Sequence, residues 1–218
     1  MRLFVALYPP PEALDDILEQ AGRLRIGELS ASGVNVRLAA RETYHVTLAF
    51  LGEVDEDRLG DVHDALGRAA ERYRRLRARA TRGVTGTVAA PVDETPRLRL
   101  GGGGRFGRGR FTVLWVGLQG EIAALRTLST AIRRELKRAR VPYDPRPYRP
   151  HLTLARPGDR AAREAIDADR DTLNDYLGPS WPLTEMVLVR SHLGPRPLYH
   201  HLGVWPLGTD QTPLSSDG

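Results

Sequence analysis

A tetrapeptide that occurs twice places the strongest constraint on how this chain can fold. His-Val-Thr-Leu at residues 45–48 returns as His-Leu-Thr-Leu at residues 151–154, 106 residues later. In both copies polar residues alternate with branched apolar ones, the two-residue period of a half-buried strand. Histidine and threonine then share one face of each strand, and the aliphatic residues enter a core. The repeat predicts two equivalent strands which, side by side, surround one cleft with two imidazoles and two hydroxyls.

The remaining periodicity places these two strands among helices and further strands. We expect helices over about 14–24, 59–76, 122–136 and 161–177, and strands over 1–8, 34–38, 98–100, 112–118, 186–191 and 198–204. Because strands occur in adjacent pairs, this order favours an α+β fold with two antiparallel sheets over a doubly wound parallel sheet. We expect one folded unit over residues 1–208, loosely duplicated, and a disordered tail over 209–218.

Composition excludes several classes of protein. The chain has no cysteine, which rules out disulfides, thiolate metal sites and a cysteine nucleophile and fits a reducing cytoplasm. No apolar run approaches the roughly 20 residues that cross a bilayer, so we expect no membrane association. The net charge of +5 and the pI near 9.9 favour a polyanionic partner such as nucleic acid. The argument is weakened by the arginine bias, since Lys137 is the single lysine and a GC-rich genome produces the same bias.

The repeated histidines and threonines suit phosphoryl chemistry better than the alternatives. A catalytic zinc normally takes at least three protein ligands, and neither His45 nor His151 has a carboxylate or cysteine at fixed spacing. No Gly-x-Ser-x-Gly turn supplies an activated serine. Two imidazoles with ordinary pKa values near 6.5 can divide the base and acid roles of an in-line displacement at phosphorus, without a metal or other cofactor. Threonine hydroxyls can donate hydrogen bonds to the phosphate oxygens.

Two further groups of residues allow more than one interpretation. The other four histidines, His63, His192, His200 and His201, are expected to be structural or solvated. The segment Gly101–Arg110 alternates glycine with arginine and one aromatic residue. It is either a mobile solvated loop or a loop that grips RNA and stacks a base. The candidate RNA contacts in this segment are Arg105, Phe106, Arg108 and Arg110.

Nearly the whole chain resembles one known family. The resemblance rests on the following segments: the two H-x-T-x motifs, the start Met-Arg-Leu-Phe-Val-Ala-Leu, Val-Leu-Trp-Val-Gly-Leu at 113–118, Tyr-Arg-Pro-His-Leu-Thr-Leu-Ala-Arg at 148–156 and Ser-His-Leu-Gly-Pro at 191–195. They resemble the RNA 2′,3′-cyclic phosphodiesterases, or 2′-5′ RNA ligase family, of the two-histidine phosphoesterase superfamily. Residues 77–97 depart from the pattern and look longer than in the relatives.

The resemblance implies a structure and an activity. The fold would be a bilobal α+β phosphoesterase fold with one motif per lobe facing a central cleft. The activity would be hydrolysis of RNA 2′,3′-cyclic phosphate ends to 2′-phosphomonoesters, with small cyclic nucleotides as a further candidate substrate. Apart from the resemblance, we expect a cytoplasmic monomer. By the same resemblance His45 is the proton donor and His151 the proton acceptor, while Thr47, Thr153 and Arg156 bind the phosphate.

Two alternatives use the same residues. Microscopic reversibility permits ligation of a 2′,3′-cyclic end to a 5′-hydroxyl, forming a 2′-5′ linkage, although bulk water favours hydrolysis. A non-catalytic module would recognise the terminal phosphate of RNA and leave it intact, and its mark would be salt-sensitive binding without turnover.

Overall fold

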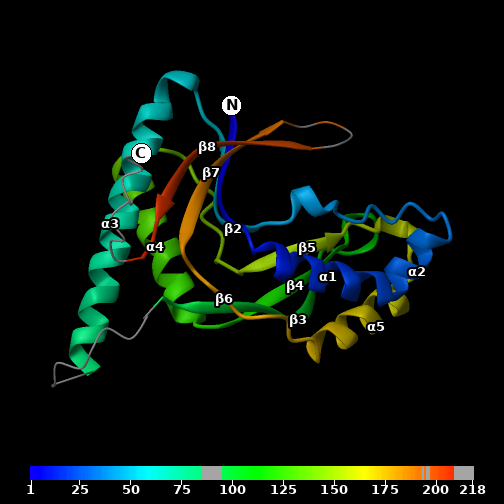
Figure 1. Ribbon diagram of the computed structural model, residues 1–218. Coiled ribbons are helices and arrows are strands. Elements are labelled where there is room, and N and C mark those ends of the chain that lie inside the picture. Colours follow the sequence, from blue (N-terminus) through cyan, green and yellow to red (C-terminus); the bar gives the residue numbers. More distant parts are fainter. Residues whose placement is uncertain (85–94, 193, 195–196, 209–218) are drawn as a thin grey trace, which may run out of the picture.

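The computed structural model describes residues 1–84, 95–192, 194 and 197–208 (Figure 1). Within that part, eight strands form one curled antiparallel sheet in the spatial order β6-β3-β4-β5-β2-β1-β7-β8. The strands are β1 (Arg2–Leu7), β2 (Val46–Glu53), β3 (Arg97–Phe106), β4 (Val113–Gly120), β5 (His151–Ala155), β6 (Trp181–Pro182), β7 (Glu185–His192) and β8 (Leu198–Pro206). The helices are α1 (Pro11–Arg23), α2 (Arg25–Ala31), α3 (Leu59–Val84), α4 (Ile122–Arg138) and α5 (Arg163–Asn174).

The two antiparallel sheets expected from the sequence are the two halves of this sheet. One half is β6-β3-β4-β5 and the other is β2-β1-β7-β8. They join where β2 and β5, the two motif strands, pair at Val46 and Leu152. The α+β prediction is therefore confirmed, and the repeated tetrapeptides lie at the seam between the halves.

The duplication is completed by an exchange of strands. The first unit of sequence runs β1-α1-β2-α3-β3 and the second runs β4-α4-β5-α5-β7, with β6 inserted before its last strand. The first strand of each unit pairs with its motif strand, but the third strand joins the other half: β7 pairs with β1, and β3 pairs with β4. The helices cross over as well, since α4 packs on β2 and α1 packs on β3. Each half of the sheet therefore contains elements from both units.

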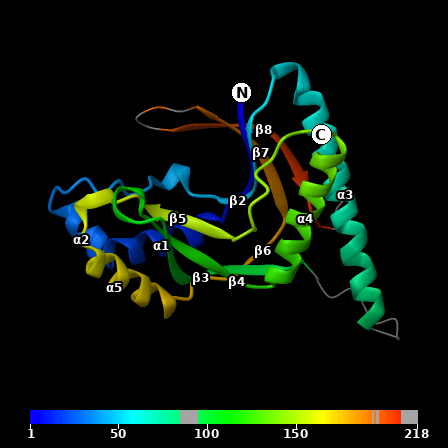
Figure 2. The same ribbon diagram turned by 180° about the vertical axis from the view of Figure 1, so that it is seen from behind.

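The helices cover one face of the sheet. Figures 1 and 2 show α3 and α4 side by side along one half of the sheet, and α1, α2 and α5 along the other half. The main apolar core lies beneath these helices and receives alternate strand residues, among them Val46, Leu48, Leu152 and Leu154. On the opposite face, a small buried cluster of strand residues includes no helical residue. We call this face, which bears the two histidines, the histidine face. Among the described residues, no helix combines the length and apolarity needed to cross a membrane.

Two sequence predictions of local structure are wrong. Residues 34–38 do not form a strand: within them, Leu38 alone makes a bridge, to Ala155, and Arg37 has a positive φ of 50°. The predicted loop Gly101–Arg110 is regular in its first part, because β3 continues through Phe106. The short strand β6 was not predicted. The expected disordered tail, residues 209–218, lies outside the described residues.

The glycines of β3 provide close packing rather than a mobile loop. A Cβ on Gly103 would lie 2.1 Å from the carbonyl oxygen of Arg170 in α5, and one on Gly104 would lie 1.9 Å from the indole of Trp115. Gly102 has a φ of 81° at the point where the register between β3 and β4 shifts. Glycine is thus required here for a β-bulge and for the close approach of α5 and Trp115.

Candidate active site

The pairing of the two motif strands assembles the repeated residues into one array. Val46 is the register partner of Leu152 in the antiparallel ladder between β2 and β5. The residues on either side of this pair place His45 beside Thr153 and Thr47 beside His151. All four point away from the helices, opposite to the apolar residues between them. The array has approximate two-fold symmetry about the Val46–Leu152 pair, as the repeated sequence predicts.

Both imidazoles are held in the same way. Nδ1 of His45 lies 2.7 Å from the carbonyl oxygen of Thr43, and Nδ1 of His151 lies 2.7 Å from that of Arg149. Because a carbonyl only accepts, each Nδ1 carries the proton and donates it. Each Nε2 is then the nitrogen left to act on a ligand: a base when the ring is neutral and a proton donor when it is charged. The two residues can therefore exchange roles according to protonation alone.

Each histidine is framed by aromatic rings of its own half. His45 lies with its ring centroid 4.7 Å from that of Phe4, 5.3 Å from that of Tyr199 and 6.2 Å from that of Tyr8. The sequence analysis missed these aromatic neighbours, although the alternation of Phe4 and Ala6 in β1 with Tyr8 just after it predicts that two of the rings share one face. Their rings restrict the imidazole of His45 and partly shield it from water.

The frame of His151 is built by β3 and β4. Phe106 meets His151 edge-on at 4.9 Å between ring centroids, and Trp115 lies at 5.7 Å. Phe106 and Trp115 also contact each other, at 5.1 Å. Trp115 reaches this position because Gly104, directly opposite on β3, leaves room for its indole.

The environment favours the neutral form of both histidines. Burial lowers the pKa of His45 from its usual 6.5 to about 4, against the opposing effect of the Thr43 carbonyl, and the positive charges of His151 and Arg156 lower it further. Burial also lowers the pKa of His151, and the charge of Arg156 adds to the decrease, while the Arg149 carbonyl opposes it. No carboxylate is among the causes of either shift. The array is thus a positively biased site in which an anion would favour protonated histidine.

The remaining predicted phosphate ligands are available for binding. Thr47 and Thr153 are half-buried, and no hydrogen bond engages either hydroxyl within the part of the chain that the structure describes. Arg156 follows β5, is exposed, and forms no ion pair with any described carboxylate. Its influence on the pKa of both histidines places its charge near the array.

The structure separates the four candidate RNA contacts of the basic segment. Phe106 lies on the histidine face against His151. Arg105, the preceding residue of β3, turns to the helix face and pairs with Asp167 of α5 at 2.9 Å. Arg108 lines a cavity on that side, and the guanidinium of Arg110 stacks 4.7 Å above the ring of Phe111. Of these four residues, Phe106 alone lies against a histidine of the array.

The other histidines lie outside the array. His63 packs against Trp205 at 5.3 Å, joining α3 to β8. His192 and His200 contact each other in the β7–β8 hairpin, and His201 contacts Tyr8, at the edge of the aromatic frame of His45. In the described ranges, no group of three or more histidine, cysteine, aspartate or glutamate residues has metal-binding geometry.

Comparison with known proteins identifies relatives over most of the chain. Residues 10–195 match the model of the 2′-5′ RNA ligase superfamily. Over 200 residues the chain is 30% identical to a Thermus thermophilus protein named RNA 2′,3′-cyclic phosphodiesterase, a match that covers 91% of this chain and 86% of the relative. An Archaeoglobus fulgidus protein of the same name is 28% identical over 207 residues, which cover 94% of this chain and 99% of the relative.

Solved structures share the fold over almost the entire length. A Thermus thermophilus protein, 29% identical, superposes with a TM-score of 0.65 and covers 95% of this chain and 98% of its own. E. coli LigT in complex with ATP, 23% identical, superposes with a TM-score of 0.64 over 95% of this chain and 98% of its own. The curled sheet, the paired H-x-T-x strands and these matches together show that the chain belongs to the 2′-5′ RNA ligase superfamily.

Proposed function

We propose that this protein hydrolyses the 2′,3′-cyclic phosphate ends of RNA to 2′-phosphomonoesters, without a metal ion. The observation that carries the proposal is the two-fold array in which both histidines are anchored through Nδ1, while neither Nε2 has a hydrogen-bond partner among the described residues. An acid and a base that face one ligand from opposite sides are what an in-line displacement at phosphorus requires.

In the proposed reaction, Nε2 of His151 accepts a proton from water as the water oxygen attacks phosphorus. The bond between phosphorus and the 3′-oxygen breaks, and protonated His45 donates its Nε2 proton to that leaving oxygen. The products are a 3′-hydroxyl and a 2′-phosphomonoester, so one water is consumed and no redox change occurs. The assignment of donor and acceptor follows the family resemblance, and the symmetry of the array also permits the opposite assignment.

Thr47, Thr153 and Arg156 are the proposed ligands of the phosphate. Each threonine lies beside the histidine of the other strand, so one hydroxyl is available on each side of the phosphorus atom. Hydroxyl donors and a guanidinium stabilise the charge that builds on the non-bridging oxygens in the transition state. Phe106 can in addition stack on a base next to the reacting phosphate.

The known relatives support this substrate class. The Thermus and Archaeoglobus relatives are named RNA 2′,3′-cyclic phosphodiesterases. E. coli LigT, which shares the fold, has been solved with 3′-AMP and with phosphate. Small 2′,3′-cyclic nucleotides contain the same reacting group and are included in the proposal.

The decisive experiment uses an oligonucleotide with a 2′,3′-cyclic phosphate end and follows its phosphorus by ³¹P NMR. We expect the cyclic phosphate to be converted to a 2′-phosphate, and we expect this activity to persist in the presence of EDTA. His45→Ala and His151→Ala should each lower kcat/KM by at least about a hundredfold, the usual contribution of a general acid or base. His200→Ala is the matched control, since this histidine is exposed and lies outside the array. Full activity in either array variant would refute the proposal.

The same assay separates the two alternatives. With an added 5′-hydroxyl oligonucleotide, ligation would yield a 2′-5′-linked product, which the histidine variants would also lose. A binding module would retain the RNA in a salt-sensitive manner and leave the cyclic phosphate intact.

A further inference from the structure

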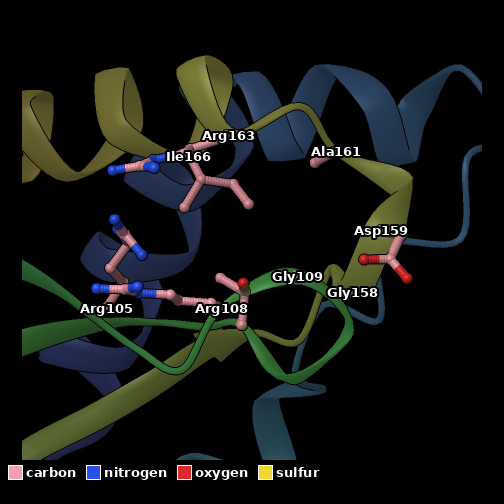
Figure 3. Close-up of a pocket in the computed structure, with 9 residues that line it drawn as sticks. Arg105, Arg108, Gly109, Gly158, Asp159, Ala161, Arg163 and Ile166 are labelled. Atoms are coloured by element: carbon pink, nitrogen blue, oxygen red, sulfur yellow. The ribbon is translucent and has the colours of Figure 1, made fainter.

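A cavity of about 370 Å³ lies on the helix face of the sheet, next to the half that holds His151. It is enclosed by the end of β3, the turn into β4, the segment after β5 and the first turn of α5 (Figure 3). We call it the arginine pocket. Arg105 in its wall is followed on β3 by Phe106, which contacts His151 from the histidine face. The pocket and the array are thus on opposite sides of one strand.

The arginine pocket is strongly cationic. Figure 3 shows the guanidinium groups of Arg105, Arg108 and Arg163 gathered at one end of the pocket, while Asp159 lies at the other end. Asp167 is the carboxylate that partly balances this charge, with Oδ1 2.9 Å from Arg105 and Oδ2 3.4 Å from Arg163. The guanidinium of Arg108 has no partner in the described part of the chain. The charges therefore leave at least one cation uncompensated.

A hydroxyl in the pocket wall also lacks a protein partner among the described residues. Thr112 is only 6% exposed and lines the pocket, yet its hydroxyl makes no hydrogen bond to any residue that the structure describes. The oxygen is not among the buried polar atoms without a partner, so the hydroxyl reaches the pocket and is open to a ligand or water. It can donate to an anion that the three arginines attract.

The start of α5 adds further donors. No side chain of the described residues caps this helix, so the amides of Arg163 and Glu164 remain unsatisfied, whereas the Ala162 carbonyl accepts from those of Ala165 and Ile166. Arg163 sits at the positive end of the helix dipole, where a cation is unfavourable unless an anion accompanies it. Ala161 and Ile166 bring this helix start to the pocket wall.

We propose that the arginine pocket binds a backbone phosphate of the RNA strand on the 5′ side of the cyclic end. Gly158 in the pocket wall is two residues from Arg156, so their Cα atoms lie within about 7 Å of each other. The strand can therefore leave the array past Arg156 and enter the pocket around the β3–β4 turn. This inference rests on the proposed function and extends it to a preference for oligonucleotides over mononucleotides.

The test compares a 2′,3′-cyclic mononucleotide with a tetranucleotide that ends in the same cyclic phosphate. In the double variant Arg108→Ala/Arg163→Ala we expect kcat/KM for the tetranucleotide to fall at least about tenfold, and its logarithmic salt slope to decrease by about 0.7 per lost phosphate contact. The mononucleotide, which has no backbone phosphate, should keep its kcat/KM. Arg126→Ala/Arg134→Ala, on the exposed side of α4, removes the same charge elsewhere and should change neither substrate.

A chemical change in the substrate supplies an independent arm. Tetranucleotides in which one linkage at a time is an uncharged methylphosphonate should reveal which phosphate the pocket holds. When that linkage is uncharged, kcat/KM of the wild-type protein should fall at least about tenfold. The double arginine variant, which has already lost the contact, should show almost no further decrease, as expected for coupled contacts in a double-mutant cycle. Thr112→Val should lower kcat/KM for the tetranucleotide and leave kcat/KM for the mononucleotide unchanged.

The outcomes separate this inference from the proposed function. Equal losses on both substrates, or no loss on the tetranucleotide, would overturn the pocket as an RNA subsite. If the unmodified protein cleaves neither substrate, the proposed function fails, and anisotropy of the labelled tetranucleotide then decides about the pocket. Binding that weakens in the arginine pair but not in the α4 control would support it, and equal binding would overturn it.

Discussion

His45 is neutral in the free protein at pH 7, because burial lowers its pKa to about 4. A residue proposed as proton donor must therefore gain its proton together with the substrate. The negative charge of a bound phosphodiester favours imidazolium and raises the pKa of both histidines, against the effect of Arg156. Substrate binding and proton uptake are in this way coupled at the array.

This coupling predicts different pH profiles for the two kinetic constants. The pH dependence of kcat/KM reports the free enzyme, in which the pKa of each histidine lies below 6.5. A bell-shaped kcat/KM should hence have its maximum below pH 6.5. The kcat profile reports the complex and should be displaced to higher pH. Steady-state rates between pH 4 and 9 measure both, and a kcat/KM maximum above pH 7 would contradict the lowered pKa values.

Arg156 provides a direct check on the cause. Its positive charge lowers the pKa of His45 and of His151, so Arg156→Ala should raise both. NMR titration of the imidazole Cε1 protons in the free protein measures this without any substrate. Arg126→Ala, which removes an arginine that is not among the causes, should leave both titrations in place. Unchanged histidine pKa values in Arg156→Ala would contradict the placement of the Arg156 charge near the two histidines.

Among the elements, β3 shows where reasoning from sequence succeeds and where it fails. The apolar alternation of Leu98 and Leu100 predicts the start of this strand, but the glycines that follow carry no side-chain pattern. Their reason is spatial, since α5 and the indole of Trp115 approach the backbone at Gly103 and Gly104. A partner so distant in sequence leaves no local signal. The same holds for α2, whose N-terminal amides at Arg25 and Ile26 are capped by Asp169 from α5.

Gly104→Ala tests the role of close packing in β3. The added Cβ would lie 1.9 Å from a ring carbon of Trp115, so the indole must move, and it contacts both Phe106 and His151. We expect a loss of about 1–3 kcal/mol in the free energy of unfolding, as for other overpacked cores, together with reduced kcat. Chemical denaturation and steady-state assays measure the two effects.

Gly60→Ala is the matched control, because a Cβ at that helical position meets no atom within 4 Å. It should retain full stability, since alanine is the better helix former. A fully stable and active Gly104→Ala protein would mean that the indole is not held by β3.

At the level of the molecule, the repeated motif predicts a duplicated fold, but it does not predict that the two units exchange their third strands, β3 and β7. The meeting of the two motif strands was predictable from the His-x-Thr pattern, because four polar side chains on two half-buried strand faces need polar partners or a shared ligand. That β3 joins the half containing β4, and β7 the half containing β1, was not predictable, since the apolar pattern of each strand fits either half equally well. The exchange follows from global packing: the pairing of β7 with β1 and of β3 with β4 completes both halves. The seam that carries the array therefore depends on both units at once.

This dependence predicts the behaviour of the separated units. A fragment of residues 1–107 has β3 without its neighbours β4 and β6, and β1 without β7, and the fragment 108–218 lacks the converse partners. Each would expose unpaired strand edges and apolar faces that the other unit normally covers, so neither should fold alone. The mixture should recover dispersed amide resonances in NMR spectra and the activity of the intact chain. A cooperative unfolding transition in either isolated fragment would contradict the exchange and would make each unit an independent lobe.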